Sequence, residues 1–279
     1  MVCCTLQYNK VSNFYSIKIM NIKFIPLFIS LAVLSGNALA DAPEARHDWT
    51  GFYVGGFVGG AAGTKTNTTD PGRSNGDFWN LYGFPSSYHT KASVMGGGTV
   101  GYNWQLGKSP YLIGLEAEYG YLGSKGSGLD PNSVPHAGSD GSHRTKIGGS
   151  YGYGLIGGRL GYAHDRSLFY VKSGAVFTTT KTNYDDFDNN PSISGTLHTS
   201  GKSDNVGYAI GGGIEQALPP EWFESAKHIS IKAEYLYLGI GRTQTTSGVD
   251  GSGVTFTTTD HIRGMHTAKI GINYQFEGF

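Results

Sequence analysis

The stretch YLIGLEAEYGYLGS, Tyr111–Ser124, alternates apolar and polar residues along most of its length. Ile113 and Leu115 share one parity with the tyrosines further on, whereas Glu116 and Glu118 occupy the other parity. Alternation with period two places these two sets on opposite faces of a β-strand. The stretch therefore predicts a strand with one apolar face and one face that carries charge.

Similar patterns of Gly, Tyr, Val, Ile and Leu at period two recur before and after this stretch. Runs of this kind, separated by clusters of turn-forming residues, are typical of β-strands. We predict an all-β protein with eight strands. The expected strands are Trp49–Lys65, Val94–Leu106, Tyr111–Ser124, Lys146–Ala163, Leu168–Thr179, Asn205–Ala217, His228–Ile240 and His266–Phe276.

The segments between these strands alternate in length. The short ones are Gly107–Pro110, His164–Ser167 and Leu218–Lys227; the long, polar ones are Thr66–Ser93, Lys125–Thr145, Thr180–Asp204 and Gly241–Met265. An even strand number with long–short alternation, and with both chain ends on the short-turn side, is the layout of a bacterial outer-membrane barrel. We expect an eight-stranded antiparallel up-and-down transmembrane β-barrel with four long surface loops and short periplasmic turns.

The beginning of the chain predicts export. Met20–Ala40 has a basic start at Lys23, an apolar run and an A-x-A site, which together are typical of a secretory signal peptide. Met20 is an alternative start of translation, and we expect cleavage after Ala40. The predicted division of the chain is a signal peptide at 1–40, a periplasmic lead at 41–48 and a barrel at 49–279.

Composition excludes several classes of protein. The 44 glycines follow no collagen period, and 13% aromatic residues argue against a disordered chain. Equal numbers of basic and acidic residues, 21 of each, give no basic footprint for nucleic acid, so we expect no nucleic-acid partner. Cys3 and Cys4 both lie in the predicted signal, so disulfide and thiolate chemistry are not expected in the mature protein.

Parity alone does not say which face of the barrel meets which solvent. A water-soluble lipocalin-type barrel would place its apolar residues inside, whereas a membrane barrel places them outside. The signal peptide and the turn layout favour the membrane. Aromatic residues near strand ends, among them Trp104, Tyr121 and Phe276, also favour it, because such residues form interfacial girdles.

Under the membrane interpretation, eight charged residues share the inward parity. Equal numbers of acids and bases in a narrow lumen favour an ion-paired plug, since unpaired charges there are costly. The alternative is a charged ring that selects ions in a small pore. The expected lumen residues are Glu116, Glu118, Arg159, Lys172, Glu215, Lys232, Glu234 and Lys269.

Catalysis and metal binding have little support in the sequence. Ser142-His143 is the nearest Ser–His pair, but it lies in a Gly-rich segment without an orienting acid, so we expect no catalytic residue and no enzyme. The spacing of the nine histidines matches no metal motif, and we expect no metal and no cofactor. The sequence HIRGMH brings His261, Met265 and His266 together as an alternative haemin-binding loop, beside the simpler interpretation of solvated loop residues.

Three stretches together resemble the opacity-type, porin-like small outer-membrane proteins of α-proteobacteria. The stretches are DWTGFYVGGFVGG at Asp48–Gly60, GRLGYAHDRSLFYVKSGAVF at Gly158–Phe177, and the pair NVGYAIGGGIEQAL and HISIKAEYLYLGIG. The closing KIGINYQF resembles the C-terminal assembly signal of such barrels through Lys269, Gly271, Tyr274 and Phe276. The tail Glu277–Phe279 departs from the family, which usually ends at the aromatic residue that Phe276 supplies here.

The resemblance implies an eight-stranded barrel in the cell outer membrane, surrounded by its lipids and inserted by the barrel-assembly machinery. Members of the family include structural barrels, small porins, surface antigens and haemin binders, so the activity is not inherited with the fold. We expect a structural, surface-exposed role. The alternatives are a narrow porin for small solutes and a surface protein that binds haemin or host ligands.

Overall fold

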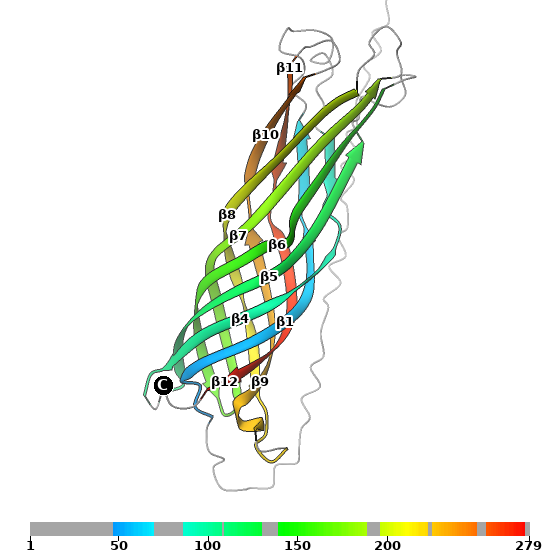
Figure 1. The fold of residues 1–279 in the computed structure, drawn as a ribbon. Helices are drawn as coiled ribbons and strands as arrows, with labels where there is room; N and C mark the ends of the chain where they lie inside the picture. Colours follow the sequence, from blue (N-terminus) through cyan, green and yellow to red (C-terminus); the bar gives the residue numbers. More distant parts are fainter. Residues whose placement is uncertain are drawn as a thin grey trace, which may run out of the picture. The chain divides into compact units, whose positions relative to one another are not determined.

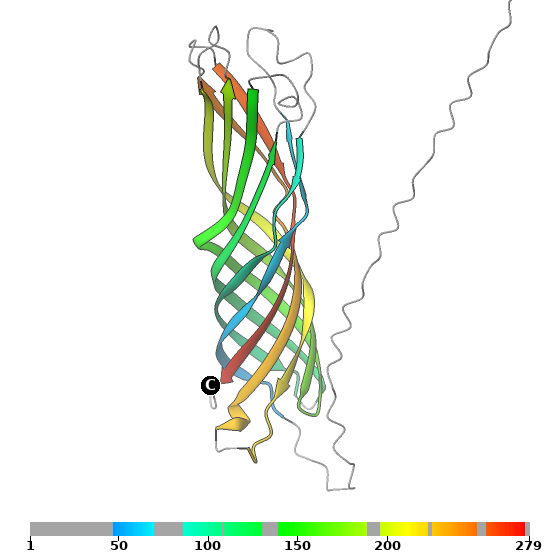
Figure 2. The same cartoon turned by 90° about the vertical axis from the view of Figure 1, so that its right-hand side faces the viewer.

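A computed structural model describes residues 47–69, 86–107, 109–129, 139–188, 196–222, 225–249 and 255–276. Eight antiparallel strands close into a barrel (Figures 1 and 2). Each barrel strand pairs with the barrel strands that precede and follow it in the chain, and the first, β1, pairs with the last, β12. The barrel strands are β1 (Gly51–Gly63), β4 (Ser93–Gln105), β5 (Tyr111–Leu129), β6 (Ser139–His164), β7 (Ser167–Asp188), β8 (Thr196–Ala217), β9 (Ile229–Gly239) and β12 (Met265–Gln275). The predicted fold class is confirmed.

Four shorter strands form a second sheet in the order β10-β11-β2-β3 at the end of the barrel with the long connections. Their bounds are β2 (Lys65–Thr69), β3 (Ser86–His89), β10 (Arg242–Val249) and β11 (Thr255–Ile262). A 3-10 turn, η3 (Ala226–His228), precedes β9 at the opposite end. Among the described residues, no helix is both long and apolar enough to cross a membrane.

The strands reach further than the sequence predicts. Segments expected as long loops contain the outer ends of β5 to β8, β2 from residue 66 on, and all of β3, β10 and β11, so those loop boundaries were wrong (Figure 2). The reason is visible in β7, whose outer half reads TTTKTNYDDFD from Thr178. Threonine favours strands, but beyond a lipid-facing zone neither face needs to be apolar, so the alternation that marks a strand disappears.

The second sheet packs against the extended barrel strands. A backbone bridge joins Thr90 to Gly126 of β5, and the hydroxyl of Thr246 in β10 donates to Thr199 of β8 at 3.2 Å. A side chain on Gly126 would contact the ring of Tyr88. These contacts tie both margins of the second sheet to the barrel.

The two faces of the barrel wall differ as the predicted parity requires. Leu115 and Tyr119 on the outer face are 57% and 60% exposed, whereas Glu116 and Glu118 on the inner face are 2% and 4% exposed. The same division holds along β4, β9 and β12. The outer wall is therefore apolar and the interior is charged, which is the reverse of a water-soluble barrel.

Glycines allow the wall to bend where strands approach closely. Gly97 of β4 lies opposite Gly120 of β5, and a side chain on either would collide with backbone atoms of the neighbouring strand. The Gly-Gly-Gly runs at 96–98 and 211–213 lie within β4 and β8, where they are strand positions without side chains.

Candidate functional site: a charge network inside the barrel

The structure places all eight of the predicted lumen residues inside the barrel and buries each of them to 4% exposure or less. They come from six strands: two each from β5 and β9, and one each from β6, β7, β8 and β12. Alternation along each strand turns them inward, and the register brings them to similar heights. The residues are Glu116, Glu118, Arg159, Lys172, Glu215, Lys232, Glu234 and Lys269.

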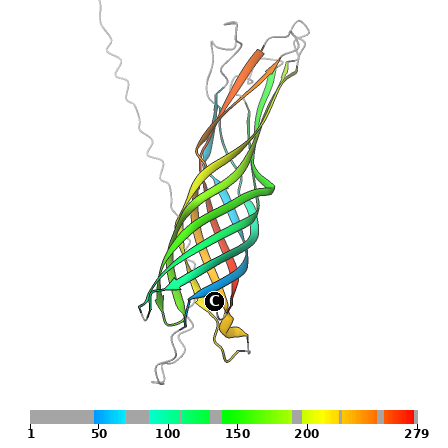
Figure 3. The same cartoon turned by 60° about the vertical axis from the view of Figure 1, so that its left-hand side comes forward.

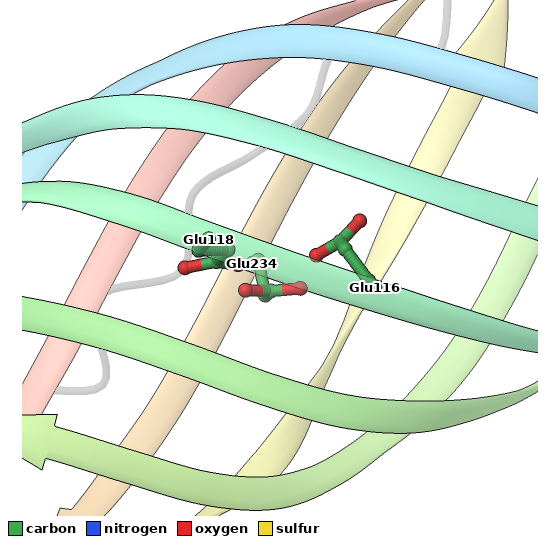
Figure 4. Close-up of side chains that lie close together, drawn as sticks. All are labelled: Glu116, Glu118 and Glu234. Atoms are coloured by element: carbon green, nitrogen blue, oxygen red, sulfur yellow. The ribbon is translucent and has the colours of Figure 1, made fainter.

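Lys172 is at the centre of the network. Its ammonium group contacts the carboxylates of Glu116 and Glu118 and lies 3.4 Å from Glu234 Oε2. Oxygens of these three carboxylates lie within 4.8 Å of one another (Figure 4). Three carboxylates so close together are stable only if cations neutralise them.

Two further lysines complete the neutralisation. Lys269 Nζ lies 2.6 Å from Glu118 Oε1 and 2.8 Å from Glu234 Oε1. Lys232 Nζ lies 3.1 Å from Glu116 Oε2. Three carboxylates could also hold a metal ion, but here the positive charge comes from ammonium groups of the chain itself.

Arg159 forms the second half of the network with Glu215. Its Nη1 donates to Glu215 Oε2 at 3.0 Å, and its Nε donates to Asn103 Oδ1 at 2.8 Å. Asn273 Nδ2 donates to the other oxygen of Glu215 at 2.7 Å. The guanidinium lies 4.6 Å from the centre of the Tyr53 ring, a distance that favours a cation–π contact.

Three buried tyrosines, which the sequence interpretation missed, each donate to a different glutamate. Their hydroxyl groups lie 2.7 to 2.9 Å from carboxylate oxygens. They add hydrogen bonds to charges that have no water around them, which strengthens the network. Their inward parity was the only signal available. The pairs are Tyr53 with Glu116, Tyr153 with Glu118, and Tyr170 with Glu234.

Apolar layers lie on both sides of the charges. Toward the short turns, a buried cluster includes Trp49, Leu112 and Leu168. Toward the long connections, a larger buried cluster includes Leu122 and Leu236. The charge network therefore lies between two apolar layers. Figure 3 shows the closed wall of strands that surrounds them.

The residues of the haemin alternative do not point the same way. Met265 is fully buried in the inner apolar cluster, whereas His261 and His266 are exposed. His261 pairs with the Thr243 hydroxyl at 2.9 Å, and His266 with the Tyr235 hydroxyl at 2.6 Å. Neighbouring positions 265 and 266 of β12 face opposite sides of the wall, so the Met265 side chain does not lie with the two histidines. The side chains of the Ser142-His143 pair lie outside the described part of the structure.

The residues of the expected assembly signal divide between the two faces of β12. Lys269 and Gly271 face inward, while Tyr274 and Phe276 are exposed and their rings lie 5.2 Å apart. The Phe276 backbone N–H donates to Phe52 at 2.8 Å, which holds the last described residue against β1. The end of β12 therefore closes the barrel seam.

Two curated proteins cover most of the chain. The 31 kDa outer-membrane immunogenic proteins of Brucella melitensis biotype 1 and Brucella suis biovar 1 are each 29% identical over 247 residues, which is 88% of this chain and 91% of the relative. Two solved structures are more distant. The attachment invasion locus protein Ail of Yersinia pestis aligns at 12% identity and a TM-score of 0.28 over 81% of this chain and 99% of its own. Neisserial surface protein A aligns at 11% identity and a TM-score of 0.29, over 81% and 98%.

The family model described as "outer membrane protein beta-barrel domain" matches residues 27–276, which is most of the chain. This match confirms the resemblance found in the sequence. Together with the Brucella relatives it places the protein in the cell outer membrane, surrounded by lipid. The chain therefore belongs to the outer membrane protein beta-barrel family.

Proposed function

We propose that this outer-membrane barrel is a closed structural scaffold that conducts no solute. Its function then depends on the surface-exposed end of the barrel, which carries the long connections. The observation that carries the proposal is the interior: each of the eight charges of the lumen network has a partner of opposite sign. Apolar layers lie on both sides of them. Arg159 Nη2 and Asn273 Oδ1 are buried without a hydrogen bond, but each charged group of the network has an ionic partner. Paired buried charges rigidify a core, and an ion crossing them would have to break several pairs at once.

The narrow porin is the competing function. A conducting pore needs binding groups that release their ion, and usually a water-filled path between them. The interior charges instead bond to one another, with N–O distances of 2.5 to 3.1 Å in four of the pairs. Eight strands enclose a space that side chains can fill, which favours the closed scaffold. The scaffold needs no catalytic residue.

A thiol placed in the lumen tests the closed interior. We expect Thr99→Cys, a buried inward position of β4 opposite Glu118, to resist a charged, water-soluble thiol reagent in the folded protein. Ser127→Cys is the matched control, because it is exposed on the extended part of β5. Both native cysteines, Cys3 and Cys4, precede the expected cleavage site, so neither would react. The scaffold is wrong if both introduced thiols are labelled at similar rates.

Export and assembly complete the proposal. The signal peptide at 1–40 would be removed after Ala40 during export, and the barrel-assembly machinery would recognise the end of β12. The support is the exposure of Tyr274 and Phe276 on the outer face, where another protein can contact them.

Replacing Phe276 is therefore expected to impair assembly in cells more than it impairs the folded barrel. We expect Phe276→Ala to lower the amount of folded protein in outer membranes several-fold, while refolding into detergent stays close to wild type because the ring is 39% exposed. Phe169→Ala, which removes an exposed aromatic ring from β7, is the matched control. Heat-dependent gel mobility of membrane fractions measures the amount of folded protein for each variant. Equal amounts of the two variants in the membrane would contradict an assembly role for Phe276.

A further inference from the structure

Four lysines on neighbouring strands, and a fifth in the segment before β4, lie side by side in the outer part of the barrel. The register pairs Lys125 of β5 with Lys146 of β6, Lys146 with Lys181 of β7, and Lys181 with Lys202 of β8. On the other side, the backbone N–H of Lys91 donates to the Lys125 carbonyl at 2.7 Å. These five positions, which we call the lysine row, cross five adjacent segments at one height.

The described side chains of the lysine row face outward. Lys91, Lys125, Lys181 and Lys202 are exposed. Their chain neighbours Ser124 and Thr180 are completely buried, as alternation requires. The row therefore presents positive charge on the outside of the wall. This is the same face that carries the exposed apolar residues of the barrel strands, which we call the apolar belt.

Such a row is unfavourable without an anion. Like charges directly opposite one another on neighbouring strands destabilise a sheet, and the register places the exposed Lys181 directly opposite the exposed Lys202. Among the described side chains, no ion pair neutralises Lys125, Lys181 or Lys202. Asp204 lies one outward position nearer the belt than Lys202, and its carboxylate accepts a hydrogen bond from Thr179 at 2.8 Å.

The height of the row identifies the source of the anion. Lys125, Lys181 and Lys202 each lie four residues beyond an exposed apolar residue: Tyr121, Phe177 and Val206 respectively. Four strand residues span about 13 Å, or about 10 Å along the membrane normal at the usual strand tilt. Lysine side chains can also extend along such a wall toward an interface. This spacing puts the row at the level expected for the lipid headgroups, on the side of the membrane with the long connections.

We propose that the lysine row binds the phosphate groups of anionic lipids in the outer leaflet. Each phosphate would lie between lysines of neighbouring strands and relieve their repulsion, while the acyl chains would cover the apolar belt below. Juxtamembrane lysines interact with anionic lipid in this way through charge and position together.

The test uses the refolded barrel from Asp41 to Phe279 in detergent micelles, titrated with diphosphorylated lipid A as the probe. The row variant is Lys181→Gln with Lys202→Gln, which neutralises two directly opposed positions. The control variant is Lys108→Gln with Lys227→Gln. It removes the same amount of charge from two of the segments that the sequence predicts as short turns. We expect the row variant to bind lipid A about 20-fold more weakly than wild type, and the control to bind it as wild type does. Heat-dependent mobility shows that every variant is folded.

Two further measurements separate the lipid from other anions. Dephosphorylated lipid A should bind wild type and row variant alike, because the row then has no phosphate to contact. Inorganic pyrophosphate and a soluble sulfated polysaccharide should bind wild type far more weakly than lipid A does. Equal lipid A affinity of the row variant and wild type would overturn the proposal. So would a preference of the row for the soluble polyanion over the lipid.

Discussion

Replacing Lys172 with methionine is expected to destabilise the folded barrel by about 3–5 kcal/mol, the usual cost of removing one partner from a buried ion pair. Lys172 contacts Glu116 and Glu118 and lies close to Glu234. Methionine fills a similar volume but carries no charge. Three carboxylates within 4.8 Å of one another would then share the two remaining lysines.

Urea unfolding of the refolded protein in lipid vesicles, followed by tryptophan fluorescence, measures this loss. Lys181→Met makes the same chemical change on the outer face of the same strand, and we expect it to change the free energy of unfolding by less than about 0.5 kcal/mol. Adding Glu118→Gln to Lys172→Met should recover part of the stability, because it removes one uncompensated charge. The network does not hold the barrel together if Lys172→Met and Lys181→Met unfold at the same urea concentration.

The barrel could be predicted because its membrane-facing half obeys one strict rule. A residue such as Leu115 meets lipid and its neighbour Glu116 meets the lumen, so period two is imposed on every strand. The same rule identified all eight lumen charges. Where the rule ends, at the outer half of β7 and β8, the prediction placed loops instead of strands.

The pairing of the lumen charges could not be predicted. Lys269 reaches Glu118 across 151 residues of sequence, and Lys232 reaches Glu116 across 116. Such pairs depend on how far each strand is staggered against the next, and alternation says nothing about that stagger. The same limit hid the tyrosines: Tyr53 shares its strand with the outward Phe52, and only the register shows that its hydroxyl meets Glu116.

Met265 and His266 show that residues adjacent in sequence need not share a site. Their closeness in sequence suggested a shared ligand, yet neighbours in a strand point to opposite faces. Met265 lies in the buried cluster and His266 is exposed. The lysine row is the opposite case, since its members are far apart in sequence and adjacent only through the strand register.

The second prediction with a large expected effect is the absence of ion conductance through the barrel, which distinguishes a closed scaffold from a porin. An ion entering from the short-turn side would meet the layer that contains Trp49 and Leu168 before it reached any charge. It would then have to replace ammonium groups that already bond Glu118 and Glu234. Transfer of a bare ion through such layers is very unfavourable, so the expected current is none.

The most direct measurement is therefore the conductance of the refolded barrel, Asp41 to Phe279, in a planar lipid bilayer at moderate salt. Heat-dependent gel mobility of the same sample shows that the barrel has closed. A folded protein that inserts and stays electrically silent is the result that the closed scaffold predicts. Stable, reproducible conductance steps that change when Glu118→Gln removes one carboxylate from the network would contradict it, because ions would then pass through the space that the ion pairs fill.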